Sequence, residues 1–355
     1  MSVLETLGWA PSLDAQFEPH RQKGLIPGRV AAQHRGGYVL YTEEGETPAE
    51  LAGELRHAAL GLGELPAVGD WVAARPARDL ATIHAVLPRR TGFSRKVAGD
   101  RTAEQVLAAN IDAVFLVSGL DGDFNQQRLE RYLTMAWESG AQPVVVLSKA
   151  DLCAAVELRV AEVEAVAIGV PVHPVNALGG EGVDQLEGYF AGNRTVALLG
   201  SSGVGKSTLV NRLTSRELQR TQEVRDDGRG RHTTTRRELI PLPGGGFVLD
   251  TPGLRELQLW DGAAGLGQTF EDVEALAREC RFSDCRHESE PGCAVKRALA
   301  DGSLSAERFA SYRKLERELR ALELRQDRLA RAAEVRLFKI RARGRHAGAR
   351  RRRTV

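Results

Sequence analysis

The residues best suited to chemistry lie in one glycine-rich segment that also carries a lysine and several hydroxyl side chains. In order they are Gly200, Ser201, Ser202, Gly203, Val204, Gly205, Lys206, Ser207 and Thr208. Glycines let successive backbone N–H groups point into one concavity, and a helix that begins there adds positive potential. Lys206 is placed to reach the β- and γ-phosphates of a nucleotide, and the Ser207 hydroxyl is placed to complete a Mg²⁺ shell. This spacing predicts a phosphate-binding loop for a nucleoside triphosphate.

The elements around this segment are the ones that a phosphate-binding loop needs. An apolar strand over residues 195–199 leads into it, and a helical pattern leads out from Lys206. From about residue 108 the chain alternates strands and helices. We expect strands at 111–118, 143–147, 172–175, 238–241 and 247–249, and helices at 126–138, 154–168 and 183–190. Such alternation predicts a mostly parallel sheet covered on both faces, with ligands at the carboxyl ends of its strands.

A second group of polar residues follows the expected strands 143–147 and 172–175 and is suited to recognising a base. The group comprises Ser148, Lys149, Ala150 and Asp151, then Asn176 and Ala177. One carboxylate, that of Asp151, accepts both the N1–H and the exocyclic amine of guanine, whereas adenine offers no such donor pair. A charged group left unpaired costs about 1–3 kcal/mol or more, which is roughly a tenfold to few-hundredfold preference for guanine. We expect Lys149 to lie along the base and ribose, and the loop at Ala177 to offer a backbone N–H to guanine O6.

Two further segments are placed to sense the γ-phosphate. The expected strand 247–249 ends in Asp250, whose carboxylate can hold Mg²⁺ through a water, and the backbone N–H of Gly253 follows. Between the phosphate loop and Asp250 lies a basic, hydroxyl-rich segment, residues 228–235, that reads Gly-Arg-Gly-Arg-His-Thr-Thr-Thr. It predicts a switch loop that orders around Mg²⁺, with Thr234 as its ligand, and loosens on hydrolysis. An ordinary surface loop is the alternative.

A Cys/His cluster in the last third of the chain has the composition of a metal site. Cys280, Cys285, His287 and Cys293 supply four ligands of the kind that tetrahedral Zn²⁺ takes. Four protein ligands leave no open position for a substrate, so we expect one structural zinc ion. The isolated Cys153 is interpreted as a small core residue.

The N-terminal and C-terminal parts have patterns of their own. Residues 28–96 carry short strands separated by turn residues, which we place at 29–33, 38–41, 51–56, 71–74 and 82–87. This pattern predicts a small closed β-barrel, with an OB-fold as the favoured type and a small sandwich as the alternative. Residues 304–343 read as a long, highly charged helix.

Length and charge bound the possible functions. A chain of 355 residues predicts two or three domains, and no apolar run approaches the ~20 residues that a membrane span needs. The start lacks the pattern of a secretion signal, and four cysteines make no disulfide framework, so we expect a cytoplasmic protein without a membrane partner. Residues 331–355 carry a net charge of +9, which leaves −7 for the rest because the whole chain carries +2. This asymmetry suggests a polyanionic partner.

The order of the motifs identifies a family. Conventional GTPases begin with the phosphate loop and end with the base-reading carboxylate, whereas Asp151 here precedes Lys206. Together with the preceding barrel, residues 228–235 and the Cys/His cluster, this order resembles the circularly permuted, ribosome small-subunit-dependent GTPase family (ribosome small subunit-dependent GTPase A). The resemblance covers about residues 28–320. Two departures are Ser148, where the family more often has Asn or Thr, and Asn176, where Ser is more usual.

The resemblance implies a GTPase that acts in late maturation of the small ribosomal subunit, stimulated by that subunit and in contact with its rRNA. It also implies an OB-fold domain (residues 1–98), a permuted GTPase domain (99–260) and a zinc-binding helical domain (261–355). Leu254 stands where many GTPases carry the Gln that orients the attacking water, so we expect slow intrinsic turnover and assign water positioning to His232. The alternative for His232 is a loop histidine with a local bond.

We further expect a monomer whose basic tail contacts rRNA. Two other functions stay open: a GTP-sensing RNA-binding protein without a catalytic role, and a phosphate-loop ATPase acting on nucleic acid, against which Asp151 argues.

Overall fold

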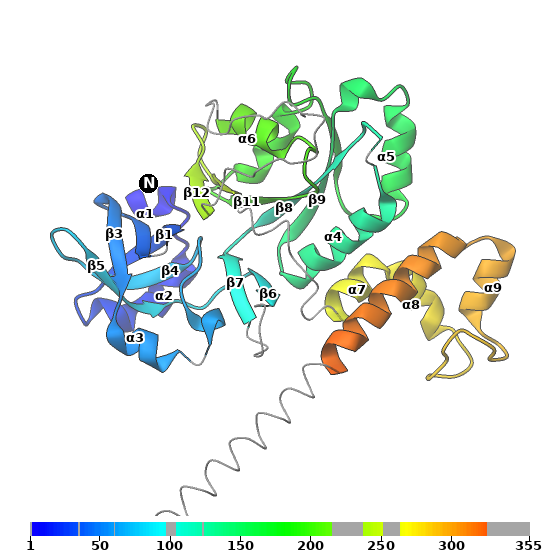
Figure 1. Ribbon diagram of the computed structural model, residues 1–355, viewed down its shortest axis with the longest axis horizontal. Coiled ribbons are helices and arrows are strands. Elements are labelled where there is room, and N and C mark those ends of the chain that lie inside the picture. The colour runs from blue at the N-terminus through cyan, green and yellow to red at the C-terminus, as the bar shows by residue number, and fades with distance from the viewer. Residues whose placement is uncertain are drawn as a thin grey trace, which may run out of the picture.

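The structure is a computed structural model, and it describes residues 2–34, 36–59, 61–96, 104–122, 124–214, 237–250 and 263–324. Figure 1 shows a small barrel near the N-terminus, then a sheet flanked by helices, then a group of helices. This architecture confirms the predicted fold class. None of the described helices is long and apolar enough to cross a bilayer.

Five strands close into the N-terminal barrel. They are β1 (Ile26–His34), β2 (Gly37–Thr42), β3 (Gly45–Leu51), β4 (Trp71–Arg75) and β5 (Ala81–Val86). Hydrogen bonding runs in the order β1-β2-β3-β5-β4 and returns to β1, and within this ring β3 and β5 form the parallel pair. Five strands closed in this way form the small Greek-key barrel of the OB-fold class, as predicted. The helices of this N-terminal part are α1 (Val3–Thr6), α2 (Pro11–Arg21), α3 (Gly53–Ala58) and the 3₁₀ turn η1 (Leu62–Glu64).

The third barrel strand differs from its prediction. We expected a strand over 51–56, but β3 ends at Leu51 and α3 follows from Gly53. Along β3 the buried residue is Ala49, so this strand carries a weak apolar signal. Leu51, at the end of β3, and Leu55, in α3, both pack against the barrel core. These two apolar residues made the segment 51–56 look like the third barrel strand.

The central sheet has the permuted order that the motifs require. Its strands are β8 (Ala113–Gly119), β9 (Gln142–Ser148), β10 (Val172–Val175), β11 (Thr195–Leu199), β12 (Arg237–Pro241) and β13 (Phe247–Asp250). They run in the order β10-β9-β8-β11-β13-β12, and all of them except the antiparallel β12 are parallel. The late strand β11 therefore lies between β8 and β13, which places the carboxyl ends of all five parallel strands along one edge.

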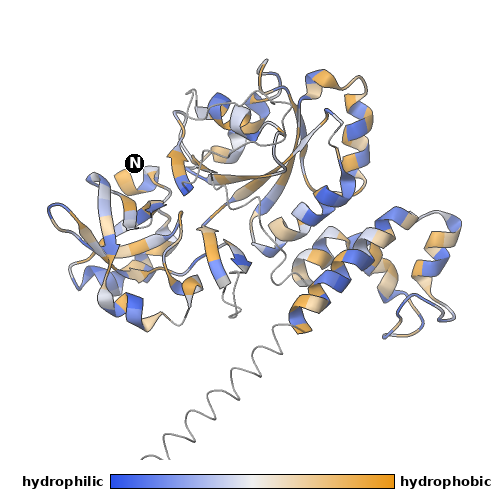
Figure 2. Ribbon diagram, in the orientation of Figure 1, coloured by the Kyte–Doolittle hydropathy of each residue, from blue (hydrophilic) through white to orange (hydrophobic). Residues whose placement is uncertain are grey.

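Helices cover both faces of this sheet because its central strands are mostly apolar, as the colouring of Figure 2 shows, and almost wholly buried. The covering elements are α4 (Gln126–Glu138), α5 (Val156–Glu164), α6 (Lys206–Thr214) and the 3₁₀ helix η3 (Asp184–Phe190). Val114 and Leu116 of β8 pack with α4 and α5 on one side. Phe115 and Val117 pack with η3 and α6 on the other.

Several sequence-based boundaries are wrong. The helix expected over 154–168 is shorter, and the one expected over 183–190 is a 3₁₀ helix. A hairpin of β6 (Gly92–Lys96) and β7 (Glu104–Ala109) was not expected at all, because only its second strand has an apolar run.

Strand β1 joins the barrel to the central sheet. It pairs with β12 through Ala32 opposite Glu238, which makes one continuous sheet. Beside this joint the guanidinium of Arg29 is buried, and it donates to the Leu7 carbonyl at 2.6 Å and the Thr195 hydroxyl at 2.5 Å. Burial lowers the pKa of Arg29 to about 10, so the group stays charged at neutral pH. Because Thr195 begins β11, the barrel is held directly to the strand that leads into the phosphate loop.

The C-terminal helices pack on α4. They are α7 (Ala263–Thr269), α8 (Glu271–Arg278), α9 (Ala294–Asp301) and a helix over residues 306–324; the rest of the expected long helix lies outside the described residues. A Cβ on Gly265 would lie 2.2 Å from the Thr134 carbonyl, so glycine permits the close approach of α7 to α4. Arg308 completes the contact. It pairs with Glu130 of α4 at 2.8 Å and with Asp272 at 2.9 Å, and both it and Glu130 are buried.

We predict that Arg308→Met loosens the C-terminal helices from α4. The substitution leaves the buried Glu130 carboxylate without its countercharge, which typically costs about 3–5 kcal/mol. Urea unfolding followed by circular dichroism should show a lower midpoint, and the double variant Arg308→Met/Glu130→Gln should recover part of the loss. Arg317→Met, on an exposed position of the same helix, is the control. Equal effects of Arg308→Met and Arg317→Met would contradict this account.

Candidate nucleotide site and metal cluster

The phosphate loop curls around its own lysine. It connects β11 to α6, which begins at Lys206, and Gly203 and Gly205 have φ angles of 81° and 94° that favour glycine. A Cβ on Gly200 would lie 2.4 Å from the Val117 carbonyl of β8, so this turn also needs glycine. The buried Lys206 ammonium donates to the Gly200 carbonyl at 2.8 Å and to the Ser201 carbonyl. Ser207 and Thr208 lie half-buried in the first turn of α6.

One hydrogen bond joins the phosphate loop to the predicted base-reading segment. The Ser148 hydroxyl, at the end of β9, donates to the Val204 carbonyl at 2.5 Å and lies 3.4 Å from the Ser118 carbonyl. Both partners of the short bond are buried. Ser148 is three residues before Asp151 and Val204 is two before Lys206. The structure therefore brings together two segments that lie more than fifty residues apart in the sequence.

The base-reading turn has a constrained backbone. Lys149 has a φ of 58°, in the left-handed region, and precedes the short 3₁₀ turn η2 (Ala150–Leu152) that contains the exposed Asp151. The Lys149 ammonium contacts the Asp121 carboxylate from the loop after β8. Sequence reasoning missed Asp121, because its position after a predicted strand is the one local signal for it.

The loop after β10 is held to the helix that carries the phosphate loop lysine. The Asn176 side-chain oxygen accepts from the Gly179 N–H at 3.0 Å, and the Asn176 carbonyl accepts from Gly180 at 2.7 Å. Arg212 of α6 donates to the Gly179 carbonyl at 3.1 Å. Ala177 packs against the apolar cluster beneath this loop. Sequence reasoning missed Arg212, whose partner is a backbone carbonyl.

Some predicted site residues cannot be placed. His232, Thr234 and Gly253 lie outside the described residues, as does Leu254. Of Asp250 the backbone alone is described: it is the last residue of β13 and pairs with Glu238 of β12. It therefore lies at the same edge of the sheet as the phosphate loop.

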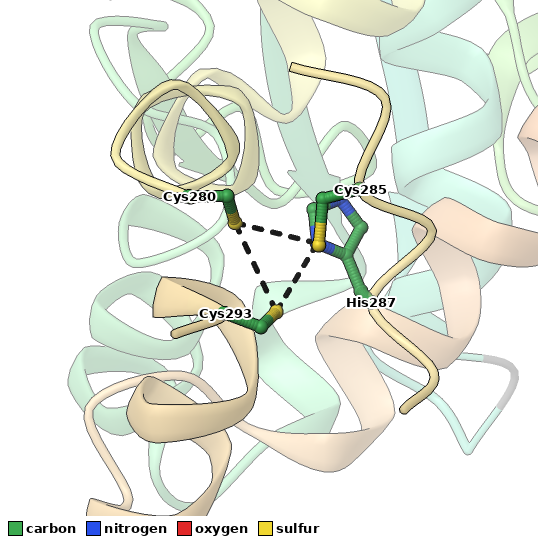
Figure 3. A group of neighbouring side chains, drawn as sticks. All are labelled: Cys280, Cys285, His287 and Cys293. Atoms are coloured by element: carbon green, nitrogen blue, oxygen red, sulfur yellow. Dashed lines mark hydrogen bonds between the residues drawn. The ribbon is translucent and has the colours of Figure 1, made fainter. Parts of the chain in front are cut away.

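The four predicted metal ligands form a compact cluster, shown in Figure 3. Their ligand atoms all lie within 4.8 Å of one another. The Sγ atoms of Cys280 and Cys293 are 3.8 Å apart, and His287 Nδ1 lies 3.6 Å from the first and 3.4 Å from the second. Ligands about 2.3 Å from a tetrahedral zinc ion lie about 3.8 Å from each other, so the observed spacing fits such an ion.

The backbone around the cluster is shaped to present these ligands. Cys293 caps α9, where its Sγ accepts from the Lys296 N–H at 3.4 Å, and His287 has a left-handed φ of 60°. The Glu290 carboxylate accepts from the N–H groups of Arg286, Glu288 and Ser289 at 2.9–3.0 Å. Backbone N–H groups, its own first among them, lower the pKa of Glu290 to about 2. Glu290 thus fixes the loop between two ligands, a role that the ligand spacing did not reveal.

Comparisons with known proteins agree with this geometry. Residues 86–260 match the model of a family described as RsgA GTPase. The small ribosomal subunit biogenesis GTPase RsgA of Opitutus terrae is 49% identical, over 95% of this chain and 96% of the relative. The protein of that name from Syntrophotalea carbinolica is 45% identical, over 94% of each chain.

Solved structures share the fold. YjeQ from Thermotoga maritima superposes with a TM-score of 0.64 and 28% identity, over 83% of this chain and 98% of that one. YloQ, described as a circularly permuted GTPase, gives a TM-score of 0.59 at 22% identity, over 84% and 96% of the two chains. Relatives that are more than 40% identical align with nearly the whole length of this chain. The protein therefore belongs to the RsgA GTPase family.

Proposed function

We propose that this GTPase binds GTP at the edge shared by β9 and β11, hydrolyses it to GDP and phosphate, and does so on the small ribosomal subunit during late maturation. The observation that carries the proposal is the bond from Ser148 to Val204, which unites the base-reading and phosphate-binding segments in one site. The names of the relatives support the choice of partner.

In this proposal the two ends of GTP meet different elements. Asp151 accepts the two guanine donors, Lys149 lies along the base and ribose, and the loop of Asn176 and Ala177 faces O6. Lys206 and the N–H groups of residues 200–205 receive the phosphates. Ser207, Thr234 and Asp250 would hold Mg²⁺, directly or through water, and the ion would offset the phosphate charge. The Gly253 N–H meets the γ-phosphate.

Hydrolysis depends on the placement of one water molecule. Leu254 has no group that can orient water, so His232 takes this role in our proposal and the intrinsic rate is slow. The subunit would raise the rate by ordering residues 228–235 around the γ-phosphate. Loosening of that segment after hydrolysis would then release the subunit.

The Cys280, Cys285, His287 and Cys293 cluster holds one structural zinc ion in this proposal. Three thiolates and one imidazole match the donors that zinc takes, and a four-ligand site has no position for a reacting group. The C-terminal helices that surround the cluster share one apolar core with it, so the metal supports their packing.

The barrel and the C-terminal helices flank the nucleotide domain as rRNA-binding units of a cytoplasmic monomer. OB-fold barrels commonly bind oligonucleotides, and the three clustered cysteines suit a reducing compartment. The basic tail, residues 331–355, adds positive charge at one end of the chain.

Turnover assays with purified small ribosomal subunits test the function. We expect slow GTP hydrolysis by the protein alone, strong stimulation by subunits, and no ATP hydrolysis in either case. ATP turnover would favour a nucleic-acid-dependent ATPase. Subunit binding that responds to GTP without any rise in turnover would favour a GTP-sensing RNA-binding protein.

The variant His232→Ala tests the assigned water-positioning residue. Subunit-stimulated turnover should fall at least about tenfold, because removing a positioned catalytic group typically costs 10²–10⁴ in rate. GDP affinity, measured by fluorescent nucleotide titration, should stay the same. Unchanged stimulated turnover would show that another group orients the water.

Removal of zinc should unfold the C-terminal helices. Metal binding supplies about 10–16 kcal/mol to zinc-dependent peptides, comparable to the ~5–15 kcal/mol of a whole domain. Chelation or Cys293→Ser should therefore lower the helical circular dichroism signal. The zinc content, expected to be one ion per chain in the parent, should fall as well. Cys153→Ser, in the nucleotide domain, is the matched control. A metal-free protein with full helical content would refute the structural role.

A further inference from the structure

The loop between two of the metal-cluster cysteines presents an aromatic side chain to solvent. Phe282 is 41% exposed, and it is the one aromatic residue among the exposed large hydrophobic side chains in the described part of the chain. The other described aromatic side chains are buried or half-buried. A single exposed aliphatic residue is ordinary on a protein surface. An exposed phenyl ring that also contacts an arginine is a different feature, because it offers a flat apolar face next to a cation.

Phe282 is held in a fixed position. The Phe282 carbonyl accepts from the Cys285 N–H at 3.3 Å, so the ring is carried by a turn that both cysteines anchor. The Arg281 guanidinium lies over one face of the ring, with its carbon 5.5 Å from the ring centroid, which leaves the other face for a ligand. The Arg281 N–H donates to the Gly292 carbonyl at 3.2 Å, and a Cβ on Gly292 would lie 3.1 Å from the Arg281 Cβ. Contact with Gly292 therefore restrains the backbone and the base of the side chain of Arg281.

Two further cations lie in the same metal-cluster segment, residues 280–296. Arg286 and Lys296 are exposed, and within the described residues neither has a carboxylate within ion-pair distance. Among the acids of this segment, Glu290 accepts from backbone N–H groups, Glu288 lies 3.5 Å from Arg313, and Asp284 and Glu288 are both exposed. None of these carboxylates lies within ion-pair distance of Arg286 or Lys296, so both cations are available to an anionic ligand.

We propose that Phe282, with Arg281 beside it, stacks on an unpaired base of rRNA, while Arg286 and Lys296 contact the flanking phosphates. This proposal rests on the proposed function, because it names the contact through which the C-terminal helices hold the subunit's RNA. Stacking on an aromatic ring requires a base outside a duplex, so the ligand is a single-stranded loop, bulge or end. Base–aromatic stacking tolerates any base, and backbone contacts to arginine and lysine supply affinity without sequence preference.

Substitutions at Phe282 separate stacking from other contacts. The probes are purified small ribosomal subunits and a single-stranded 12-nucleotide RNA with a central 2-aminopurine, whose fluorescence falls when it stacks. Phe282→Ala should weaken binding of both probes about 5- to 100-fold and abolish the fluorescence change. Phe282→Trp and Phe282→Tyr should bind within about twofold of the parent. Phe282→Leu should behave like Phe282→Ala, because it keeps an apolar side chain but loses the flat ring.

Three controls make each outcome decisive. Leu158→Ala removes an exposed aliphatic side chain, 60% exposed, from α5 of the nucleotide domain and should change neither signal. Zinc content and basal GTP turnover should be the same in every Phe282 variant. Full binding by Phe282→Ala would overturn the proposal, and full subunit binding by Phe282→Leu would show that the ring instead enters an apolar protein pocket. If the parent failed to respond to subunits, the proposed function would fail while the oligonucleotide still tested the stacking.

Discussion

The proposed nucleotide site is built around one buried hydrogen bond between segments that the sequence keeps far apart. The Ser148 hydroxyl donates to the Val204 carbonyl, and this bond fixes the end of β9 against the phosphate loop. It can form because β11 inserts between β8 and β13, so that all the parallel strands end at one edge. The chain order of the motifs then has no effect on their position in space, since permutation moves the termini and leaves the strand neighbours unchanged.

Two buried arginines connect this site to the flanking units. Arg29 reaches from the barrel to the first residue of β11, and Arg308 reaches from the C-terminal helices to α4. Each arginine makes hydrogen bonds to both sides of its boundary, so displacement of either unit would leave buried guanidinium N–H groups without acceptors. In the proposed function, a shift of a flanking unit would therefore act directly on β11, which leads into the phosphate loop, or on α4, which follows β8.

Local patterns were enough for elements whose signal lies in consecutive residues. The strands 172–175 and 195–199 match their predicted bounds, since each is a short segment between turn residues. The metal cluster also forms as expected. The barrel strand β3 was misplaced because its residues are mostly polar, and apolar content decided the prediction.

Most of the residues that sequence reasoning missed act through long-range contacts, and Glu290, which bonds within its own loop, is the exception. Asp121, Arg212 and Arg308 look like ordinary charged surface residues in the sequence. Their roles come from partners that only the fold supplies, among them a lysine across the site, a loop carbonyl and a buried glutamate. Arg308 carries no local sign of its burial, because the helix around it is highly charged.

The most direct test of the account is nucleotide affinity in the variant Asp151→Asn. An asparagine amide accepts from N1–H but donates at the second position, so it matches xanthine, which has a carbonyl where guanine has an amine. The account predicts that GDP affinity falls at least about tenfold and that xanthosine diphosphate becomes the better ligand. Asp184→Asn, exposed elsewhere in the same domain, should leave affinities unchanged. Unaltered preference for GDP in Asp151→Asn would contradict the claim that Asp151 and the phosphate loop bind one guanosine nucleotide.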